Sequence, residues 1–416
     1  MAGGASREFD VVVWGASGFT GRLVAEHLSK RYPPESDLRW AMAGRNREKL
    51  EQVRRDLGEG GAEIPLLIAD SHDAGSLTAM VRRARVVCST VGPFARYGDA
   101  LVAACAEHGT HYADITGEIQ WVRRMIDRHE ETARQSGARL VHCCGFDSIP
   151  ADLGCRLASQ AMQDRHGRAC DEIKYLVRRI KGTFSGGTVA SLLHVFDEVK
   201  QDRSIRRILA NPYSIAPDTD RRPRQVTQRG PSWDEDLGSW TAPYVMAAVD
   251  EKIVHRSNAL NGDAYGRGLR YREAICTGRG PAGYFRALSA TAGLTGFMAG
   301  VAFPPTRALL NRFVLPQPGE GPDREQREKG LFKIVVVGTA GEQQVRVRID
   351  GERDPGYGAT SRMLGESAAC LAIDGDTLPV GGGSWTPASC MADALRPRLA
   401  RHAGVTFAVE EPARRS

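Results

Sequence analysis

The chain has 416 residues, of which 42% are hydrophobic and 25% are charged, and its formal net charge is +6. This length is sufficient for two domains with a core each, and the composition is typical of a globular protein. The positive charge is scattered, and basic clusters such as 221–224 lack interleaved aromatic residues, so we expect no nucleic-acid partner. The nine cysteines lack Cys-x-x-Cys or metal-like Cys/His spacing, which predicts reduced thiols and no metal site. Residues 1–10 have no apolar signal-peptide core, and we expect a cytoplasmic protein.

A glycine-rich turn follows the first apolar run, in the sequence DVVVWGASGFTG at 10–21. The glycines follow the spacing G-x-x-G-x-x-G, which permits a sharp turn, close approach of a pyrophosphate and tight packing of the next helix on the strand. The N–H groups and dipole of that helix favour a phosphate, although a purely structural turn is the alternative. We expect the nucleotide to contact Gly15, Ser17, Gly18, Phe19, Thr20 and Gly21.

The end of the next strand, at 38–43, bears on which nucleotide binds. An NAD site usually has an acidic residue there for the ribose 2′-hydroxyl, whereas this chain has Arg45. A guanidinium can pair bidentately with a 2′-phosphate. The alternative is that Arg45 and Arg47 are solvated residues at a helix start, but cations there oppose the helix dipole. We therefore favour NADP(H) over NAD as the cofactor.

The first half of the chain alternates short apolar runs with amphipathic helical patterns. This alternation predicts a doubly wound, parallel α/β sheet of the Rossmann type, with ligands beyond the carboxyl ends of the strands. The expected strands are 10–14, 38–43, 64–69, 85–90, 110–114 and 139–144. The expected helices are 17–30, 47–57, 75–84, 99–108 and 118–136.

Several polar residues follow these strands. Asp70 is placed to reach an adenine amine, with capping of the following helix as an equal alternative. The turn after the fourth strand offers backbone and hydroxyl groups for the nicotinamide ribose, or is only a structural Gly-Pro turn. Its residues are Thr90, Val91, Gly92 and Pro93.

The run VVCSTVGPFARYGDALVAACAEHGTHYADITGE, followed by HCCGFDSIPADLG, resembles the saccharopine dehydrogenase-like oxidoreductases, and most closely the bacterial trans-acting enoyl reductases. Segments 181–191, 257–266, 316–322 and 351–361 also resemble that branch, so the resemblance covers nearly the whole chain. It implies an N-terminal Rossmann domain and an inserted α/β domain that shapes the substrate cleft. It also implies reduction of a small hydrophobic or carrier-bound substrate in lipid, glycolipid or polyketide assembly.

We therefore expect an NADP-binding domain at 1–150, a substrate domain at 151–380 and a C-terminal segment at 381–416 that packs back on the first domain. Residues 203–242 are rich in Arg, Pro, Asp and Ser, which predicts a long lid-like loop. Residues 287–306 carry no charge and contain many small residues. They form either a packed helix, a peripheral membrane contact or, least favoured, a membrane span. A homodimer is compatible with the sequence.

Reduction of an enoyl group needs a donor for the enolate oxygen and a proton for the α-carbon. Tyr97 is the first candidate donor, and the alternative is that its ring only packs over the Gly-Pro turn. Asp147 is the second catalytic candidate, and the alternative is that it serves as a helix N-cap. The further strand-end candidates are Asp114, Glu118 and His142. A mechanism based on backbone groups and water is also open.

Two other functions compete with a reductase. One is a saccharopine-type enzyme that forms or cleaves a C–N bond of an amino acid, which would need cations such as Arg178, Arg179 and Lys181 to hold carboxylates. The other is a non-catalytic NADP-binding protein on a lipid surface.

Overall fold

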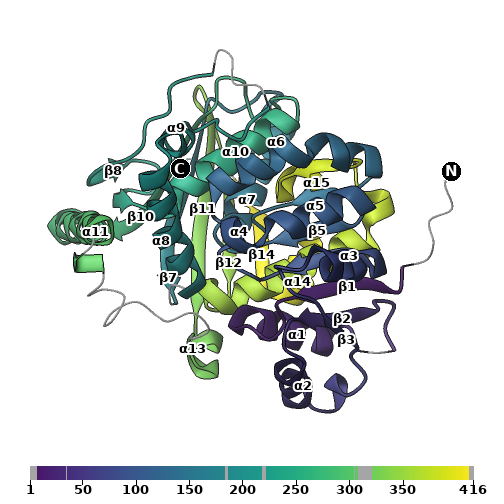
Figure 1. The fold of residues 1–416 in the computed structure, drawn as a ribbon. Coiled ribbons are helices and arrows are strands. Elements are labelled where there is room, and N and C mark those ends of the chain that lie inside the picture. The colour runs from purple at the N-terminus through teal and green to yellow at the C-terminus, as the bar shows by residue number, and fades with distance from the viewer. Residues whose placement is uncertain are drawn as a thin grey trace. The chain divides into compact units, whose positions relative to one another are not determined.

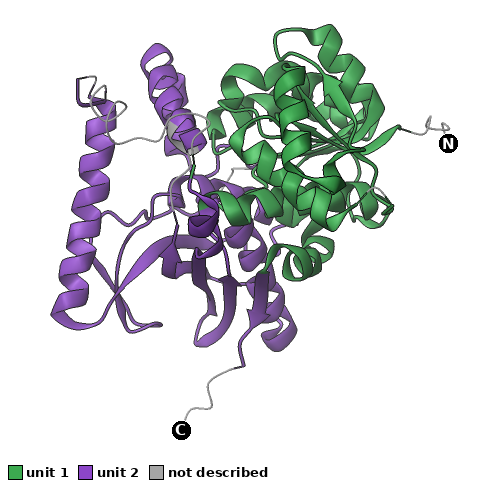
Figure 2. Cartoon of the chain, turned by 90° about the horizontal axis from the view of Figure 1, so that it is seen from below, with its two compact units in different colours: residues 1–146, 319–321, 356–404 green, residues 147–318, 322–355, 405–416 purple. Residues whose placement is uncertain are grey.

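The computed structural model describes residues 7–33, 35–182, 186–217, 222–303, 305–307 and 321–411. Residues 183–185 and 316–320, which belong to two of the family-like segments, lie outside the described residues. The chain forms two compact units (Figure 2). Unit 1 contains residues 1–146, 319–321 and 356–404, and unit 2 contains residues 147–318, 322–355 and 405–416.

Unit 1 is built on a seven-stranded sheet in the order β13-β6-β5-β4-β1-β2-β3, and every pair of neighbours is parallel (Figure 1). Its strands are β1 Phe9–Trp14, β2 Trp40–Gly44, β3 Leu66–Ile68, β4 Ala84–Ser89, β5 His111–Asp114, β6 Arg139–Val141 and β13 Gly383–Trp385. The six residues of the central β1 are all buried, as expected for a parallel strand covered on both faces. The expected parallel α/β fold is confirmed, and the six expected strands all form.

The helices of unit 1 begin and end at local signals in the sequence. Asn46 and Asp73 cap α2 and α3 through side-chain oxygens, and glycines in the left-handed conformation end α5 and α6. These helices are α1 Phe19–Arg31, α2 Arg47–Asp56, α3 Ala74–Arg83, α4 Phe94–Tyr97, α5 Asp99–His108, α6 Ile119–Ser136, α14 Thr360–Ile373 and α15 Pro387–Arg398. Short 3₁₀ or π turns cover Glu59–Gly61, Pro355–Ala359, Gly375–Thr377 and Leu399–Ala403.

Residues 356–404 return to unit 1 late in the chain. The helix α14 packs against β1, β4 and β5 and against α1, and β13 adds the seventh strand beside β6. Residues 405–411 then pair in unit 2, where β14 lies beside β12. The expected C-terminal segment 381–416 is thus distributed over both units.

Unit 2 contains a mixed seven-stranded sheet in the order β14-β12-β11-β7-β10-β9-β8. Only the pair β7 and β10 is parallel. Its strands are β7 Glu172–Lys181, β8 Ser232–Asp234, β9 Ser239–Pro243, β10 Arg270–Gly278, β11 Leu331–Ala340, β12 Gln343–Gly351 and β14 Val405–Val409. Its helices are α7 Ile149–His166, α8 Gly186–Gln201, α9 Ser204–Ala210, α10 Ala247–Leu260, α11 Gly280–Ala302 and α13 Arg324–Glu328. The helix α7 packs on β7, β11 and β12, and α10 packs on α7 and β10.

The expected lid-like loop at 203–242 is only partly irregular, because residues 211–217 and 222–231 form no helix or strand but most of the rest of the described segment does. This segment contains the helix α9 and the hairpin of β8 and β9, which pairs with β10. The strands are only three and five residues long. Such short elements offer too few positions for an alternating pattern to stand out among Arg, Pro and Asp.

Candidate functional site

The glycine turn between β1 and α1 has the geometry that its spacing predicts. Gly15 has φ +86°, and a Cβ atom there would lie 2.6 Å from Val91 Cγ2. A Cβ atom on Gly21 would lie 2.1 Å from the Gly15 carbonyl oxygen, so this glycine lets α1 approach the turn. Gly18 is exposed, and its Cβ would meet only the Gly15 oxygen, at 3.3 Å. Packing therefore requires glycine at 15 and 21, whereas fewer atoms surround position 18.

The first turn of α1 is open to an anion. Gly18 is the N-cap residue and no side chain caps the helix. The first N–H groups of a helix have no acceptor within the helix, and they carry the positive end of its dipole. Ser17, Phe19 and Thr20 surround this turn and are all partly exposed. A phosphate at this position would meet several backbone donors.

Arg45, the residue predicted to bind the 2′-phosphate of the nucleotide, directly follows β2. Arg45 is exposed and makes no hydrogen bond or ion pair with any residue that the structure describes, whereas Arg47 lies near the Glu51 carboxylate. Asp70 follows β3 and accepts a hydrogen bond from His72 N–H at 2.9 Å. The helix after it is capped by Asp73 and not by Asp70.

The turn after β4 is attached to the glycine turn. The Thr90 hydroxyl donates to the Trp14 carbonyl oxygen at 3.0 Å, and Val91 packs beside Gly15. Gly92 is exposed, and Pro93 occupies the N-cap position of α4. These contacts hold the predicted ribose-binding backbone beside the predicted phosphate-binding backbone.

A buried carboxylate that the sequence left among the strand-end candidates supports this turn. Glu118 accepts hydrogen bonds from the N–H groups of Phe94, at 2.8 Å, and Ala95, at 2.9 Å. Its own N–H donates to the Thr116 hydroxyl, and the Thr116 N–H donates to Asp114. Glu118 thus fixes the start of α4, and its role is positional.

Tyr97 is half-buried at the end of α4. Its ring meets the His72 ring edge-on, with centroids 5.8 Å apart, and the Arg96 guanidinium lies over it at 5.3 Å. Tyr97 therefore packs against His72 in the loop after β3.

His142 and Asp114 form a buried pair at the carboxyl ends of β6 and β5. His142 Nδ1 lies 2.7 Å from Asp114 Oδ2, and Asp114 also accepts from the Cys143 N–H. The His142 ring lies against Tyr112 and Trp121, and its Nε2 atom has no partner among the described residues. His142 is 3% exposed, so its position is that of a core residue.

Asp147 begins unit 2. Burial raises the pKa of its carboxyl group to about 6, although the residue is partly exposed. It does not cap α7: Ser148 takes that position, and the Ser148 hydroxyl donates to Asp250 at 3.1 Å. Burial, with the charges of Glu273 and Asp147, raises the pKa of Asp250 strongly, and burial raises that of Glu273 to about 8.

Asp250 and Glu273 are within hydrogen-bond reach of each other, and the Tyr271 hydroxyl donates to Glu273 at 3.2 Å. The raised pKa values mean that this pair holds at least one proton near neutral pH. Sequence reasoning missed both residues, because Asp250 lies in α10 and Glu273 in β10, far apart in the chain. A carboxylate within the β10 sequence RYREAICTG was the one available signal.

Residues 11–141 match the family described as "Saccharopine dehydrogenase NADP binding domain". A trans-acting enoyl reductase of Mycobacterium tuberculosis is 40% identical over 408 residues, which are 95% of this chain and 96% of that protein. A second protein of Mycobacterium tuberculosis is 42% identical over 407 residues, 94% of this chain and 96% of the relative. Among solved structures, the homospermidine synthase of Legionella pneumophila is similar with a TM-score of 0.49 and 9% identity, over 98% of this chain and 93% of that one.

The parallel sheet and its glycine turn define the class of dinucleotide-binding oxidoreductases. Within this class the chain belongs to the saccharopine dehydrogenase-like family of the trans-acting enoyl reductases, and it is an NAD(P)-dependent oxidoreductase. The predicted family is confirmed.

Proposed function

We propose that this protein uses NADPH to reduce the enoyl group of a lipid or polyketide-type intermediate. The observation that carries the proposal is the likeness, over nearly the whole chain, to proteins named trans-acting enoyl reductases. The exposed Arg45 beside an open helix N-terminus supports NADPH as the form of the cofactor.

The bound cofactor would supply a hydride to the β-carbon of the substrate. The residues would then stabilise the enolate and provide a proton for the α-carbon. Tyr97 has a hydroxyl at the half-exposed end of α4, beside the Arg96 cation, which suits an oxyanion donor. Asp147, with a pKa of about 6, is partly protonated near neutral pH and suits a proton donor.

The first test is titration of the protein with NADPH and NADH, for the wild type and Arg45→Ala. We expect NADPH to bind more tightly, and Arg45→Ala to weaken NADPH about 10- to 100-fold with little effect on NADH, since hydrogen bonds to a charged group are lost. Arg47→Ala is the matched control, because Arg47 already lies near Glu51. Equal weakening of both nucleotides by Arg45→Ala would contradict the role of Arg45.

The second test is oxidation of NADPH in the presence of enoyl thioesters of increasing chain length. Tyr97→Phe and Asp147→Asn should lower kcat and leave NADPH affinity unchanged. For Asp147 the loss of activity in the wild type should follow deprotonation above about pH 6. Tight NADPH binding without turnover of any enoyl thioester would overturn the proposed reaction but not the cofactor site.

A further inference from the structure

The helix α11 of unit 2 is the most exposed apolar element of the described chain. It packs against β9 and β10 (Figure 1). Its buried residues are Gly283, Ala287 and Val301. The approach is close, because a Cβ atom on Gly283 would lie 2.2 Å from the Gly278 carbonyl oxygen.

The face of α11 opposite Gly283 and Ala287 is apolar, and it is exposed among the residues that the structure describes. We call it the apolar stripe of α11, and its residues, three or four positions apart, are Phe285, Leu288, Ala292, Gly296, Ala299 and Phe303. This spacing places them on one side of a helix. All six are exposed, with exposed fractions of 63% for Phe285, 44% for Leu288 and 60% for Phe303. Three large apolar side chains along one helix face mark an interaction surface.

A chain of aromatic rings lies at the start of the stripe. Trp233 meets Trp240 with centroids 5.7 Å apart, Trp240 meets Tyr284 at 4.9 Å, and Tyr284 meets Phe285 at 5.8 Å. Trp233 and Tyr284 are 44% and 39% exposed. Trp and Tyr are enriched where a protein meets the interface between lipid and water, because their rings are apolar and their N–H or O–H groups are polar.

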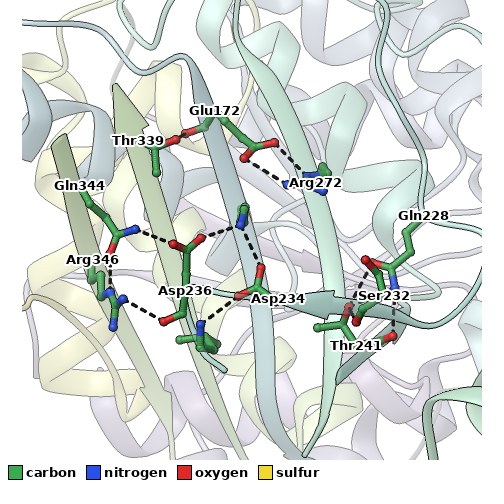
Figure 3. A network of polar contacts seen from close by, with 12 residues as sticks. Glu172, Gln228, Ser232, Asp234, Asp236, Thr241, Arg272, Thr339, Gln344 and Arg346 are labelled. Atoms are coloured by element: carbon green, nitrogen blue, oxygen red, sulfur yellow. Dashed lines mark hydrogen bonds and ion pairs between the residues drawn. The ribbon is translucent and has the colours of Figure 1, made fainter. Parts of the chain in front are cut away.

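The hairpin that carries the two tryptophans is held firmly (Figure 3). Lys174 Nζ lies 3.0 Å from the Asp234 carboxylate and 2.6 Å from that of Asp236, and Gln344 donates to Asp236 at 2.8 Å. The Thr241 hydroxyl donates to the Ser232 carbonyl oxygen at 2.9 Å. The aromatic rings therefore occupy fixed positions, and no large ordering cost opposes their contact with a surface.

The charged residues of the helix segment itself are all arginines, of which Arg307 is paired with the Asp197 carboxylate. Residues 279–307 contain three arginines and no acidic residue. Arg279 and Arg286 each donate to a backbone carbonyl oxygen, of Gly238 and Thr277, and neither pairs with a carboxylate among the described residues. A second copy of this face would bring like charges together, whereas anionic headgroups complement them. Within the described chain no helix is long and apolar enough to cross a membrane.

We propose that α11 is an interfacial helix that docks unit 2 on an anionic lipid surface. The apolar stripe enters the boundary between headgroups and acyl chains, Trp233 and Tyr284 lie at headgroup level, and Arg279 and Arg286 contact lipid phosphates. This proposal is independent of the reaction that the protein catalyses, because it depends on unit 2 alone.

The test is co-sedimentation of the whole protein with vesicles of phosphatidylcholine, with and without phosphatidylglycerol. The triple variant Phe285→Ser, Leu288→Ser and Phe303→Ser should lose binding at least about tenfold, since three buried apolar side chains are removed from the lipid. The matched control is Ile68→Ser, Val226→Ser and Ile373→Ser, which alters three other exposed apolar residues and should bind as the wild type does. Circular dichroism verifies folding of both variants.

The charge contribution is tested separately. Arg279→Gln with Arg286→Gln should weaken binding to the anionic vesicles about fivefold for each arginine and leave the weak binding to neutral vesicles unchanged. Arg206→Gln with Arg401→Gln is the control, because both of these arginines are exposed on other helices and turns. Tryptophan emission should shift to the blue on anionic vesicles, and the shift should diminish in Trp233→Phe.

Three results would overturn the proposal. The first is recovery of the wild type wholly in the supernatant with both vesicle types, and the second is sedimentation of the triple serine variant to the same extent as the wild type. The third is a lipid-free dimer that the triple serine variant converts to a monomer, without any binding to vesicles, which would make a second copy of the chain the occupant of the stripe.

Discussion

At the scale of single residues, the three glycines of the first turn have different tasks. Gly15 and Gly21 are confined by several neighbouring atoms, whereas a Cβ atom on Gly18 would meet a single atom, the Gly15 carbonyl oxygen at 3.3 Å. Their roles in the fold and in ligand binding can therefore be separated by substitution.

We predict that Gly18→Val keeps the fold and abolishes NADPH binding, because the valine would occupy the approach of the pyrophosphate. Gly21→Val should instead lower the free energy of unfolding by several kcal/mol or prevent folding, since its Cβ would lie 2.1 Å from a backbone oxygen. Thermal melting and calorimetric titration distinguish the two outcomes. Normal NADPH affinity in a folded Gly18→Val variant would exclude this turn as the phosphate site.

Glu118 gives a second prediction at this scale. Glu118→Gln keeps one acceptor oxygen but removes the negative charge of the carboxylate that accepts hydrogen bonds from the Phe94 and Ala95 N–H groups. We therefore expect the free energy of unfolding to fall by about 2 kcal/mol. Since those two residues follow the predicted ribose-binding turn, NADPH affinity should fall as well. Urea unfolding and NADPH titration check both effects, and Glu107→Gln, on the exposed side of α5, serves as the control. An unchanged unfolding midpoint would refute the positioning role.

The sequence indicated part of the site at this scale and missed the rest for a physical reason. Arg45 was visible because it directly follows an apolar strand, at the position where dinucleotide sites read the ribose. The function of Glu118 could not be predicted, because the N–H groups that donate hydrogen bonds to its carboxylate belong to residues 24 and 23 positions earlier in the chain. Only the folded sheet brings the end of β5 beside the end of β4.

At the scale of elements, a strand was predictable where an apolar run and a turn signal coincide. β1, β4 and β5 form within one residue of their expected starts. β13 was missed because Gly383–Trp385 has only three residues and pairs with a strand far away in sequence. A helix was among the predictions for 287–306, and the structure has one, α11, at Gly280–Ala302. The sequence left open whether this helix is packed or exposed, because periodicity alone does not show the surroundings of small residues.

The packing of α10 on β10 leads to a prediction about pH. The carboxyl groups of Asp250 and Glu273 face Asp147, Glu251 and several tyrosines of neighbouring elements, and these tyrosines are Tyr175, Tyr244 and Tyr271. The pKa of Glu273 is about 8 in the folded protein against an ordinary value of 4.5. Between these values the folded state binds more protons than the unfolded state, so the free energy of unfolding decreases as the pH rises from about 4.5 to 8.

We expect Glu273→Gln to reduce this decrease, because a glutamine cannot titrate; one proton corresponds to a slope of about 1.4 kcal/mol per pH unit. Urea unfolding at a series of pH values, compared between the variant and the wild type, measures the difference. Glu342→Gln, at an exposed position before β12, is the control and should keep the wild-type slope. A Glu273→Gln slope equal to that of the wild type would mean that Glu273 is ionised throughout.

At the scale of the whole molecule, the two units do not follow one another along the chain. The chain leaves unit 1 after Phe146, rejoins it briefly at Gly321 and again at Gly356, and leaves it once more after Gly404. Its last part gives one strand to each sheet, β13 to unit 1 and β14 to unit 2. Truncations near the C-terminus should therefore affect the two units separately, according to which strand is removed.

A chain that ends at Gly404 tests this arrangement. It would lose β14, whose Val405 is buried and whose pairing with β12 closes one edge of the second sheet. It would also lose the bond from Arg165 to the Glu410 carbonyl oxygen. We expect weaker protection of β12 and α7 in hydrogen exchange, with unchanged protection of β1 and β4 and unchanged NADPH affinity. A chain that ends at Glu411 keeps β14 and should match the full-length protein, so a loss of NADPH affinity specific to the shorter chain would show that β14 supports the nucleotide site.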